Sequence, residues 1–331
     1  MRVGLIGYYN YGNYGDELFK AQLETTAPDA VFEVLDQLKL MTDESYRDWF
    51  RREVDVTILG GGDLIIPYGW AEWYFQSILL EKPLLVFGVG VPTWGGHDNT
   101  AVAKMKDFFS HRNVKFFATR DKESTDWVLE HLNPQIPVQT FADMICAMPL
   151  PTIEKPAQKI FTFITREQQP GEIAWANIEA LTARARAYGY HIRNLILGTG
   201  ITAEQDSTIL SAEGTHMDWE VVGGEDNETL TRRIGESTVV ASMKFHGCVV
   251  ATMFGIPAIG LSTTDKFTSL LNAIERPDLT AHHTDPDLAD RLPKFVAPIP
   301  RCTVARLRAS AEAGLTALSN ALAYIKAEQT A

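Results

Sequence analysis

The strongest constraint on the fold is the alternation of short β-branched runs with longer stretches of helical apolar spacing. Residues 2–8, 54–62, 83–90 and 114–120 read as buried strands. Residues 16–27, 70–81 and 99–112 lie between them and place apolar side chains at helical intervals. Strands that alternate with helices are typical of a parallel sheet with crossover helices. The pattern therefore predicts an α/β fold.

A proline-rich segment divides this pattern into two halves. Residues 147–158 contain three prolines, and the alternation resumes after them with a strand at 159–167. We predict an N-terminal domain over residues 1–148 and a C-terminal domain over 149–331, which includes an amphipathic helix at 303–329. Doubly wound sheets bind ligands at the carboxyl ends of their strands, so we expect the functional residues at those ends.

Composition excludes several classes of protein. The chain has 331 residues and a net charge of -12, which argues against a nucleic-acid partner. It contains no apolar stretch of the roughly 18 residues that a membrane span needs. Three separate cysteines, Cys146, Cys248 and Cys302, show neither a disulfide framework nor metal-ligand spacing. We expect a cytoplasmic protein, in solution or peripheral to the inner face of the membrane.

The segment 242–260 is nearly all apolar, yet Lys244 and His246 stand near its beginning. They lie between a predicted strand and a predicted helix, whose N-terminus favours anions. Lys266 occupies the next strand-to-helix junction. Adjacent parallel strands would bring these three side chains to one rim, which predicts a local anion site. The alternative is that the pair only begins a buried helix.

Two glycine-rich loops follow predicted strands. Gly12 and Gly15 precede Asp16 and Glu17, which fall in the first turn of a helix. These acidic residues could be a plain helix cap, or they could bind sugar hydroxyls. Gly61 and Gly62 end another strand without the lysine and hydroxyl of a nucleotide-binding loop. They predict a turn or a close approach of backbone to ligand.

Two arginines, Arg120 and Arg166, also end predicted strands. The planar guanidinium suits carboxylate and phosphate oxygens. A solvated or paired arginine is the alternative for each, and Asp121 is a ready partner for Arg120.

Together, the segments "NYGDE", "GGGDLI", "TRDKES" and "SMKFHGCVVATMFGIPAIGLSTTDKFTSLL" resemble the polysaccharide pyruvyl transferase family. The resemblance implies two Rossmann-like domains with mainly parallel sheets, arranged as in B-type glycosyltransferases. It implies a transferase that uses phosphoenolpyruvate to build a pyruvate ketal on a sugar of a cell-surface polysaccharide or its lipid-linked precursor. His246 and Lys266 match the family's donor-binding residues. Lys244 stands where the family usually has arginine, and the tyrosine often found before the downstream lysine is absent.

The resemblance also implies roles for the candidate residues. Phosphoenolpyruvate carries a carboxylate and a phosphate, which Lys244, Lys266 and either Arg120 or Arg166 would bind. His246 would act as general acid or stabilise the departing phosphate, and Asp16 or Glu17 would orient the acceptor or act as base. The N-terminal domain would be the acceptor side and the C-terminal domain the donor side, with no cofactor and no metal. Two other hypotheses stay open: a B-type glycosyltransferase that uses a nucleotide-sugar, and a non-catalytic sugar- or anion-binding protein.

Overall fold

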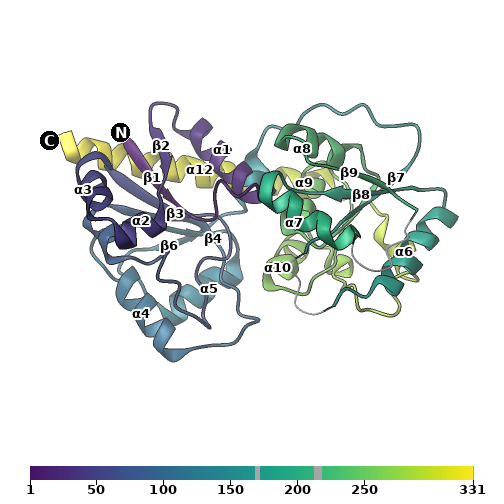
Figure 1. The fold of residues 1–331 in the computed structure, drawn as a ribbon, viewed down its shortest axis with the longest axis horizontal. Coiled ribbons are helices and arrows are strands. Elements are labelled where there is room, and N and C mark those ends of the chain that lie inside the picture. The colour runs from purple at the N-terminus through teal and green to yellow at the C-terminus, as the bar shows by residue number, and fades with distance from the viewer. Residues whose placement is uncertain (168–171, 212–217, 331) are drawn as a thin grey trace. The chain divides into compact units, whose positions relative to one another are not determined.

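The computed structural model describes residues 1–167, 172–211 and 218–330, which form two compact units (Figure 1). Unit 1 comprises Met1–Asn10, Phe19–Ala147 and the chain from Ala309 onward. Unit 2 comprises Tyr11–Leu18 and Met148–Arg308. The boundary after Ala147 falls in the predicted linker. The division differs from the predicted domains because residues 11–18 belong to unit 2 and most of the C-terminal helix belongs to unit 1.

Unit 1 contains a six-stranded parallel sheet with the order β2-β1-β3-β4-β5-β6. Its strands are β1 (Arg2–Ile6), β2 (Val31–Val34), β3 (Val56–Gly60), β4 (Leu84–Val89), β5 (Val114–Thr119) and β6 (Val138–Thr140). The helices along this part of the chain are α1 (Tyr14–Thr26), α2 (Gln37–Thr42), α3 (Glu44–Glu53), η1 (Ser77–Glu81), α4 (Asn99–Phe109), α5 (Lys122–His131) and η2 (Met144–Ala147). Strands β3 and β4 are buried along almost their whole length, as expected for a parallel sheet that helices cover.

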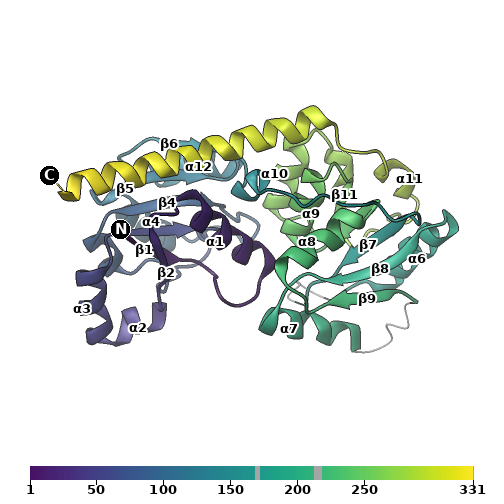
Figure 2. The ribbon, with the colours of Figure 1, turned by 90° about the horizontal axis from the view of Figure 1, so that it is seen from above.

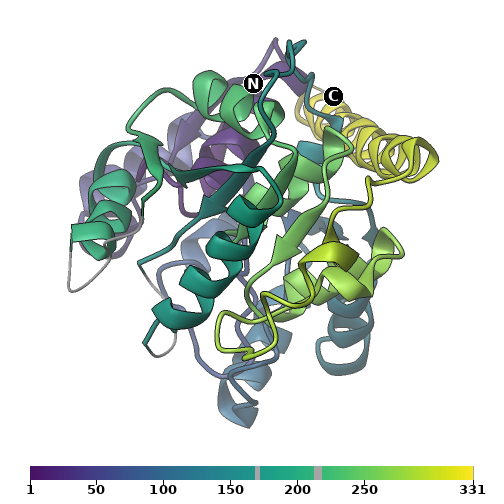
Figure 3. The same ribbon diagram turned by 90° about the vertical axis from the view of Figure 1, so that its right-hand side faces the viewer.

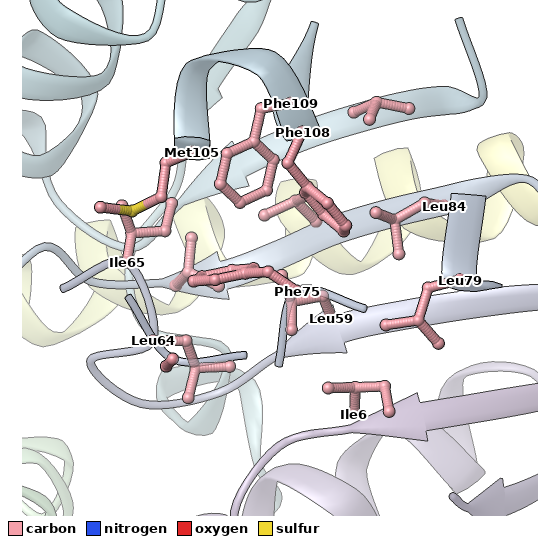
Figure 4. Packing of buried hydrophobic residues seen from close by; sticks show 14 of the residues in the cluster. Ile6, Leu59, Leu64, Ile65, Phe75, Leu79, Leu84, Met105, Phe108 and Phe109 are labelled. Carbon is pink, nitrogen blue, oxygen red and sulfur yellow. The ribbon is translucent and has the colours of Figure 1, made fainter. Parts of the chain in front are cut away.

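Two hydrophobic clusters form the core of unit 1. In one, Phe75, Met105, Phe108 and Phe109 pack with strand residues such as Leu59 (Figure 4). The other includes four residues of the C-terminal helix α12 (Arg301–Thr330), which are Leu315, Leu318, Leu322 and Ile325. Figure 2 shows this helix running alongside the sheet of unit 1. The apolar face of α12 explains why its larger part belongs to unit 1.

The helix predicted over residues 70–81 does not form as a single element. Only Ser77–Glu81 is helical, and it is a short 3₁₀ turn, η1. Gln76 has an extended backbone, with φ -75° and ψ 135°, which interrupts the helix. Its buried side-chain amide donates to the carbonyl oxygens of Trp73 and Gln37 instead. These side-chain hydrogen bonds accompany the break in the helix at Gln76, which the apolar spacing alone does not indicate.

Unit 2 contains a five-stranded parallel sheet with the order β11-β10-β7-β8-β9, with helices on both sides (Figure 3). Its strands are β7 (Ile160–Ile164), β8 (His191–Ile196), β9 (Glu220–Gly223), β10 (Val239–Ser242) and β11 (Ala258–Gly260). Its helices are α6 (Trp175–Ala187), α7 (Gly200–Ser211), α8 (Asn227–Glu236), α9 (Phe245–Met253), α10 (Asp265–Ala273), η3 (Pro277–Leu279) and α11 (Leu292–Phe295). The strand order reverses between β7 and β10, and ligands of such sheets bind at the carboxyl side of this switch point.

Within the described part of the chain, no helix combines the length and apolar character needed to cross a bilayer.

Candidate active site

The switch point of unit 2 gathers several of the predicted residues. Arg166 follows β7, Lys244 follows the neighbouring strand β10, and His246 lies in the first turn of α9. Lys266 begins α10 after β11, which pairs with β10. Because all these strands are parallel, their carboxyl ends meet at one edge of the sheet. The sequence predicts one rim for Lys244, His246 and Lys266, and the pairing of β7 with β10 adds the strand end before Arg166 to the same edge.

Lys244 is buried and has an acidic partner that the sequence did not reveal. Its ammonium forms an ion pair with Asp206 of α7 and donates to the carbonyl oxygen of Leu197 at 2.8 Å. Asp206 Oδ1 also accepts the backbone N–H of Glu167 at 2.9 Å. Burial lowers the pKa of Lys244, against the opposing attraction of Asp206. Lys244 and Asp206 therefore tie together the ends of β7, β8 and β10.

Asp206 leaves only a weak signal in the sequence. It lies three residues after Ala203 on the buried side of α7, where both side chains are nearly inaccessible. A carboxylate on the buried face of a helix needs a partner of opposite charge. The sequence alone does not identify Lys244 as that partner.

Residues 11–14, which belong to unit 2, pack against the loop after β8 and the helices α7 and α8 of the same unit. The backbone N–H of Thr199 donates to the carbonyl oxygen of Gly12 at 2.9 Å, and Thr202 Oγ1 donates to that of Tyr11 at 2.7 Å. Gly12 has φ +75°, and a β-carbon there would stand 1.9 Å from the Thr199 carbonyl oxygen. Only glycine fits this position. The Tyr14 hydroxyl completes the contact with a buried 2.6 Å hydrogen bond to Thr231.

This segment brings the start of α1 against His246. The imidazole Nδ1 would lie 1.7 Å from a β-carbon built on Gly15. Asp16 is buried, and its charge acts on Lys244. Glu17 instead accepts the backbone N–H of Gly12 at 3.2 Å, which closes the loop. Of the two predicted acidic residues, Asp16 faces the cationic cluster, whereas Glu17 fits the helix-cap interpretation.

Phe245 connects His246 with Lys266. The rings of Phe245 and His246 lie 5.0 Å apart between centroids, and those of Phe245 and Phe267 lie 5.9 Å apart. The ammonium of Lys266 lies 6.0 Å from the Phe245 centroid, within cation–π range. Lys266 is half-buried, so its charge stays closer to solvent than that of Lys244.

The two predicted arginines belong to different units. Arg166 is half-buried in unit 2, and its charge acts on Lys244. Arg120 is buried in unit 1, where it forms an ion pair with Asp63. Gly61 and Gly62 also belong to unit 1 and have positive φ angles of 74° and 78°. Arg120 therefore fits the paired alternative, and Arg166 lies beside the cationic cluster of unit 2.

Solved structures of similar fold share little sequence with this chain. UDP-GlcNAc 2-epimerase from Methanocaldococcus jannaschii, in complex with UDP-GlcNAc and UDP, aligns with a TM-score of 0.58 at 8% identity, over 92% of this chain and 98% of that chain. UDP-GlcNAc 2-epimerase from Neisseria meningitidis, bound to UDP-GlcNAc, aligns with a TM-score of 0.55 at 9% identity, over 98% and 100% of the two chains. This likeness confirms the predicted fold class of two Rossmann-like domains.

Comparison of the sequence with known families identifies the family, which the likeness in fold does not. A search of curated protein sequences gives no significant match. The family model for polysaccharide pyruvyl transferase matches residues 13–265, which span the loop before α1, the switch point of unit 2 and the start of α10. This chain belongs to the polysaccharide pyruvyl transferase family.

Proposed function

We propose that this protein transfers the pyruvyl group of phosphoenolpyruvate to a pair of hydroxyls on a sugar, forming a pyruvate ketal. The sugar would belong to a cell-surface polysaccharide or its lipid-linked precursor. The single observation that carries the proposal is the cluster of Arg166, Lys244, His246 and Asp16 at the switch point of unit 2, within the family match. An acidic protein with a local cationic cluster is suited to a small anionic substrate.

The contacts of the three cationic side chains suggest different roles for them in binding the donor. Lys244 already neutralises Asp206, so we assign it a supporting role that holds the ends of β7 and β10 in place. Arg166 and Lys266 are half-buried, and we assign the carboxylate and phosphate of the donor to them. The N-terminus of α9 adds backbone N–H groups that favour an anion.

The proposed reaction balances without a further reactant. A proton adds to the methylene carbon of phosphoenolpyruvate, which makes the central carbon electrophilic. One sugar hydroxyl attacks that carbon, and its proton passes to a base. The bond from carbon to the phosphate oxygen then breaks. The second hydroxyl attacks the same carbon to close the ketal, and its proton passes to the departing phosphate, which leaves as hydrogen phosphate. His246 is the general acid or the group that stabilises the departing phosphate, and Asp16 orients the acceptor hydroxyls.

Calorimetry with phosphoenolpyruvate and with UDP-GlcNAc tests the donor. We expect phosphoenolpyruvate to bind and UDP-GlcNAc not to bind, and phosphate release to require an added glycan. Binding of UDP-GlcNAc alone would favour the glycosyltransferase hypothesis. Binding of phosphoenolpyruvate without turnover on any acceptor glycan would favour a non-catalytic binding protein.

A further inference from the structure

Unit 1 displays an aromatic pair on the loops that follow β3 and β4. The rings of Tyr68 and Trp94 lie 5.4 Å apart between centroids, with their planes inclined by 52°. Trp94 is 56% exposed, although a large apolar side chain of this kind is normally covered. An exposed aromatic group at the carboxyl edge of a parallel sheet lies where such folds bind ligands.

The backbone holds Trp94 in this exposed position. Residues 93–96 form a turn in which the N–H of Gly96 donates to the carbonyl oxygen of Thr93 at 3.0 Å. Gly95 lets the Tyr68 ring pack on the chain, because a β-carbon there would stand 2.3 Å from that ring. Apart from its two chain neighbours, no described residue places an atom within 4 Å of the β-carbon position at Gly96. The space next to Gly96, on the C-terminal side of Trp94, is therefore open.

Hydrogen bonds join the two loops, so the aromatic pair is held from both sides. The backbone N–H of Asp98 donates to the carbonyl oxygen of Pro67 at 2.8 Å. Nearer the strands, the N–H of Gly90 donates to the carbonyl oxygen of Gly62 at 2.9 Å. A preorganised aromatic surface binds a ligand at a lower entropic cost than a flexible one.

The charge of these loops indicates which ligand they suit. Residues 62–73 and 91–98 contain Asp63, Glu72 and Asp98 but no lysine or arginine. Lys104 of the neighbouring helix α4 lies over the Trp70 ring, 5.6 Å from its centroid.

A nucleotide phosphate or an anionic membrane surface would need cations on these loops. A neutral sugar does not, because its C–H groups can stack on the negative face of an aromatic ring. The exposed carboxylate of Glu72 can also accept hydrogen bonds from its hydroxyls. The other two carboxylates are engaged, since Asp63 pairs with Arg120 and Asp98 caps α4.

We propose that Trp94 and Tyr68 form a stacking site for a pyranose ring of the acceptor glycan. This proposal rests on the proposed function, which supplies the class of acceptor. Trp94 would contribute affinity for the glycan and would take no part in the chemical step.

Saturation-transfer difference NMR tests this site with methyl galacto-, gluco- and mannopyranosides. We expect a signal from at least one glycoside, a loss of at least fivefold in Trp94→Ala, and recovery in Trp94→Phe. Tyr324→Ala, which removes an exposed aromatic residue from α12 in the same unit, should keep the wild-type signal. No signal from any glycoside, or an equal signal in Trp94→Ala, would overturn the proposal.

Two further probes address other ligands. A Trp94-dependent signal from uridine would assign the pair to a nucleobase, and Trp94-dependent binding to phosphatidylglycerol vesicles would assign it to a membrane surface. Either result overturns the sugar site. Calorimetry with phosphoenolpyruvate on the same samples separates the two proposals, because loss of the sugar signal with donor binding intact refutes only this one. Sugar binding without donor binding would refute only the proposed reaction.

Discussion

The imidazole of His246 lies directly against the backbone of Gly15, so that a β-carbon on Gly15 would stand 1.7 Å from Nδ1. Two segments far apart in the chain therefore meet at the candidate catalytic histidine. Residues 11–14 hold this contact through hydrogen bonds to Thr199 and Thr202. The absent side chain of Gly15 is what leaves room for the ring.

Gly15→Ala should lower turnover by displacing the imidazole of His246, and the protein should still fold. The added methyl group must push the imidazole aside, and such a displacement costs roughly 100-fold in turnover. Phosphate release from phosphoenolpyruvate in the presence of an acceptor glycan measures the effect. Gly69→Ala is the matched control, because in the part of the chain that the structure describes only its chain neighbours come within 4 Å of its β-carbon position, and its φ is not positive. Wild-type turnover in Gly15→Ala would argue against a catalytic role for His246.

Asp206→Asn should destabilise the protein by about 3 to 5 kcal/mol, because it leaves the buried ammonium of Lys244 without its counter-ion. Urea unfolding measures the free energy. The double variant Asp206→Asn/Lys244→Met should recover part of this loss, since no unpaired charge then remains buried. Strictly additive effects of the two substitutions would show that the ion pair is not coupled as the structure indicates.

The two arginines should respond differently to truncation. Arg166→Ala should weaken phosphoenolpyruvate binding by roughly 10- to 100-fold, as expected for lost charge-assisted hydrogen bonds. It should leave the midpoint of urea unfolding almost unchanged. Arg120→Ala should instead destabilise unit 1 by about 3 kcal/mol, because it leaves Asp63 without its buried partner. The reverse pattern would transfer the donor contact to Arg120.

Lys266→Ala should weaken phosphoenolpyruvate binding about tenfold at low salt, and less at high salt. Calorimetry at two ionic strengths measures this change. Lys159→Ala is the matched control, since Lys159 also lies over an aromatic ring, 5.8 Å from the Tyr190 centroid. It directly precedes β7 at the opposite, amino edge of the same sheet. An equal loss in both variants would indicate a general charge effect rather than a donor contact.

His283 should make unit 2 sensitive to mild acid. Burial and the neighbouring His282 lower its pKa below 6.5. Nδ1 accepts the backbone N–H of Ala174 at 3.3 Å, and Nε2 has no hydrogen-bond partner within the described part of the chain. The unfolded state therefore binds more protons than the folded state as the pH falls below about 6.5. Stability should fall there, by at most about 1.4 kcal/mol per pH unit.

Urea unfolding at pH 7.5 and pH 5.5 checks the effect of His283. His283→Gln should reduce the difference in unfolding free energy between the two pH values. His111→Gln, which replaces a histidine of unit 1, is the control and should keep the wild-type difference. An unchanged pH response in His283→Gln would assign the acid sensitivity to other groups.

The sequence by itself determined the fold class of two mainly parallel α/β sheets and the family. These depend on local patterns: β-branched runs, helical spacing, prolines and a contiguous block around His246. Strand ends can be read in the same way, so the sequence predicts one rim for Lys244, His246 and Lys266 and a strand end for Arg166. Helices and strands can be recognised in the sequence because each buries one face, and the residues of that face recur at a fixed interval along the chain.

Only the tertiary structure decided the partners of these residues. The pairing of Lys244 with Asp206 joins positions 38 residues apart, and Gly15 meets His246 across most of the chain. The extended backbone of Gln76 likewise interrupts a predicted helix, and its side-chain amide donates to the carbonyl oxygen of Gln37, 39 residues away. Burial makes an unpaired charge or polar group costly, so the partner available in three dimensions decides the local outcome. Sequence spacing does not encode that partner.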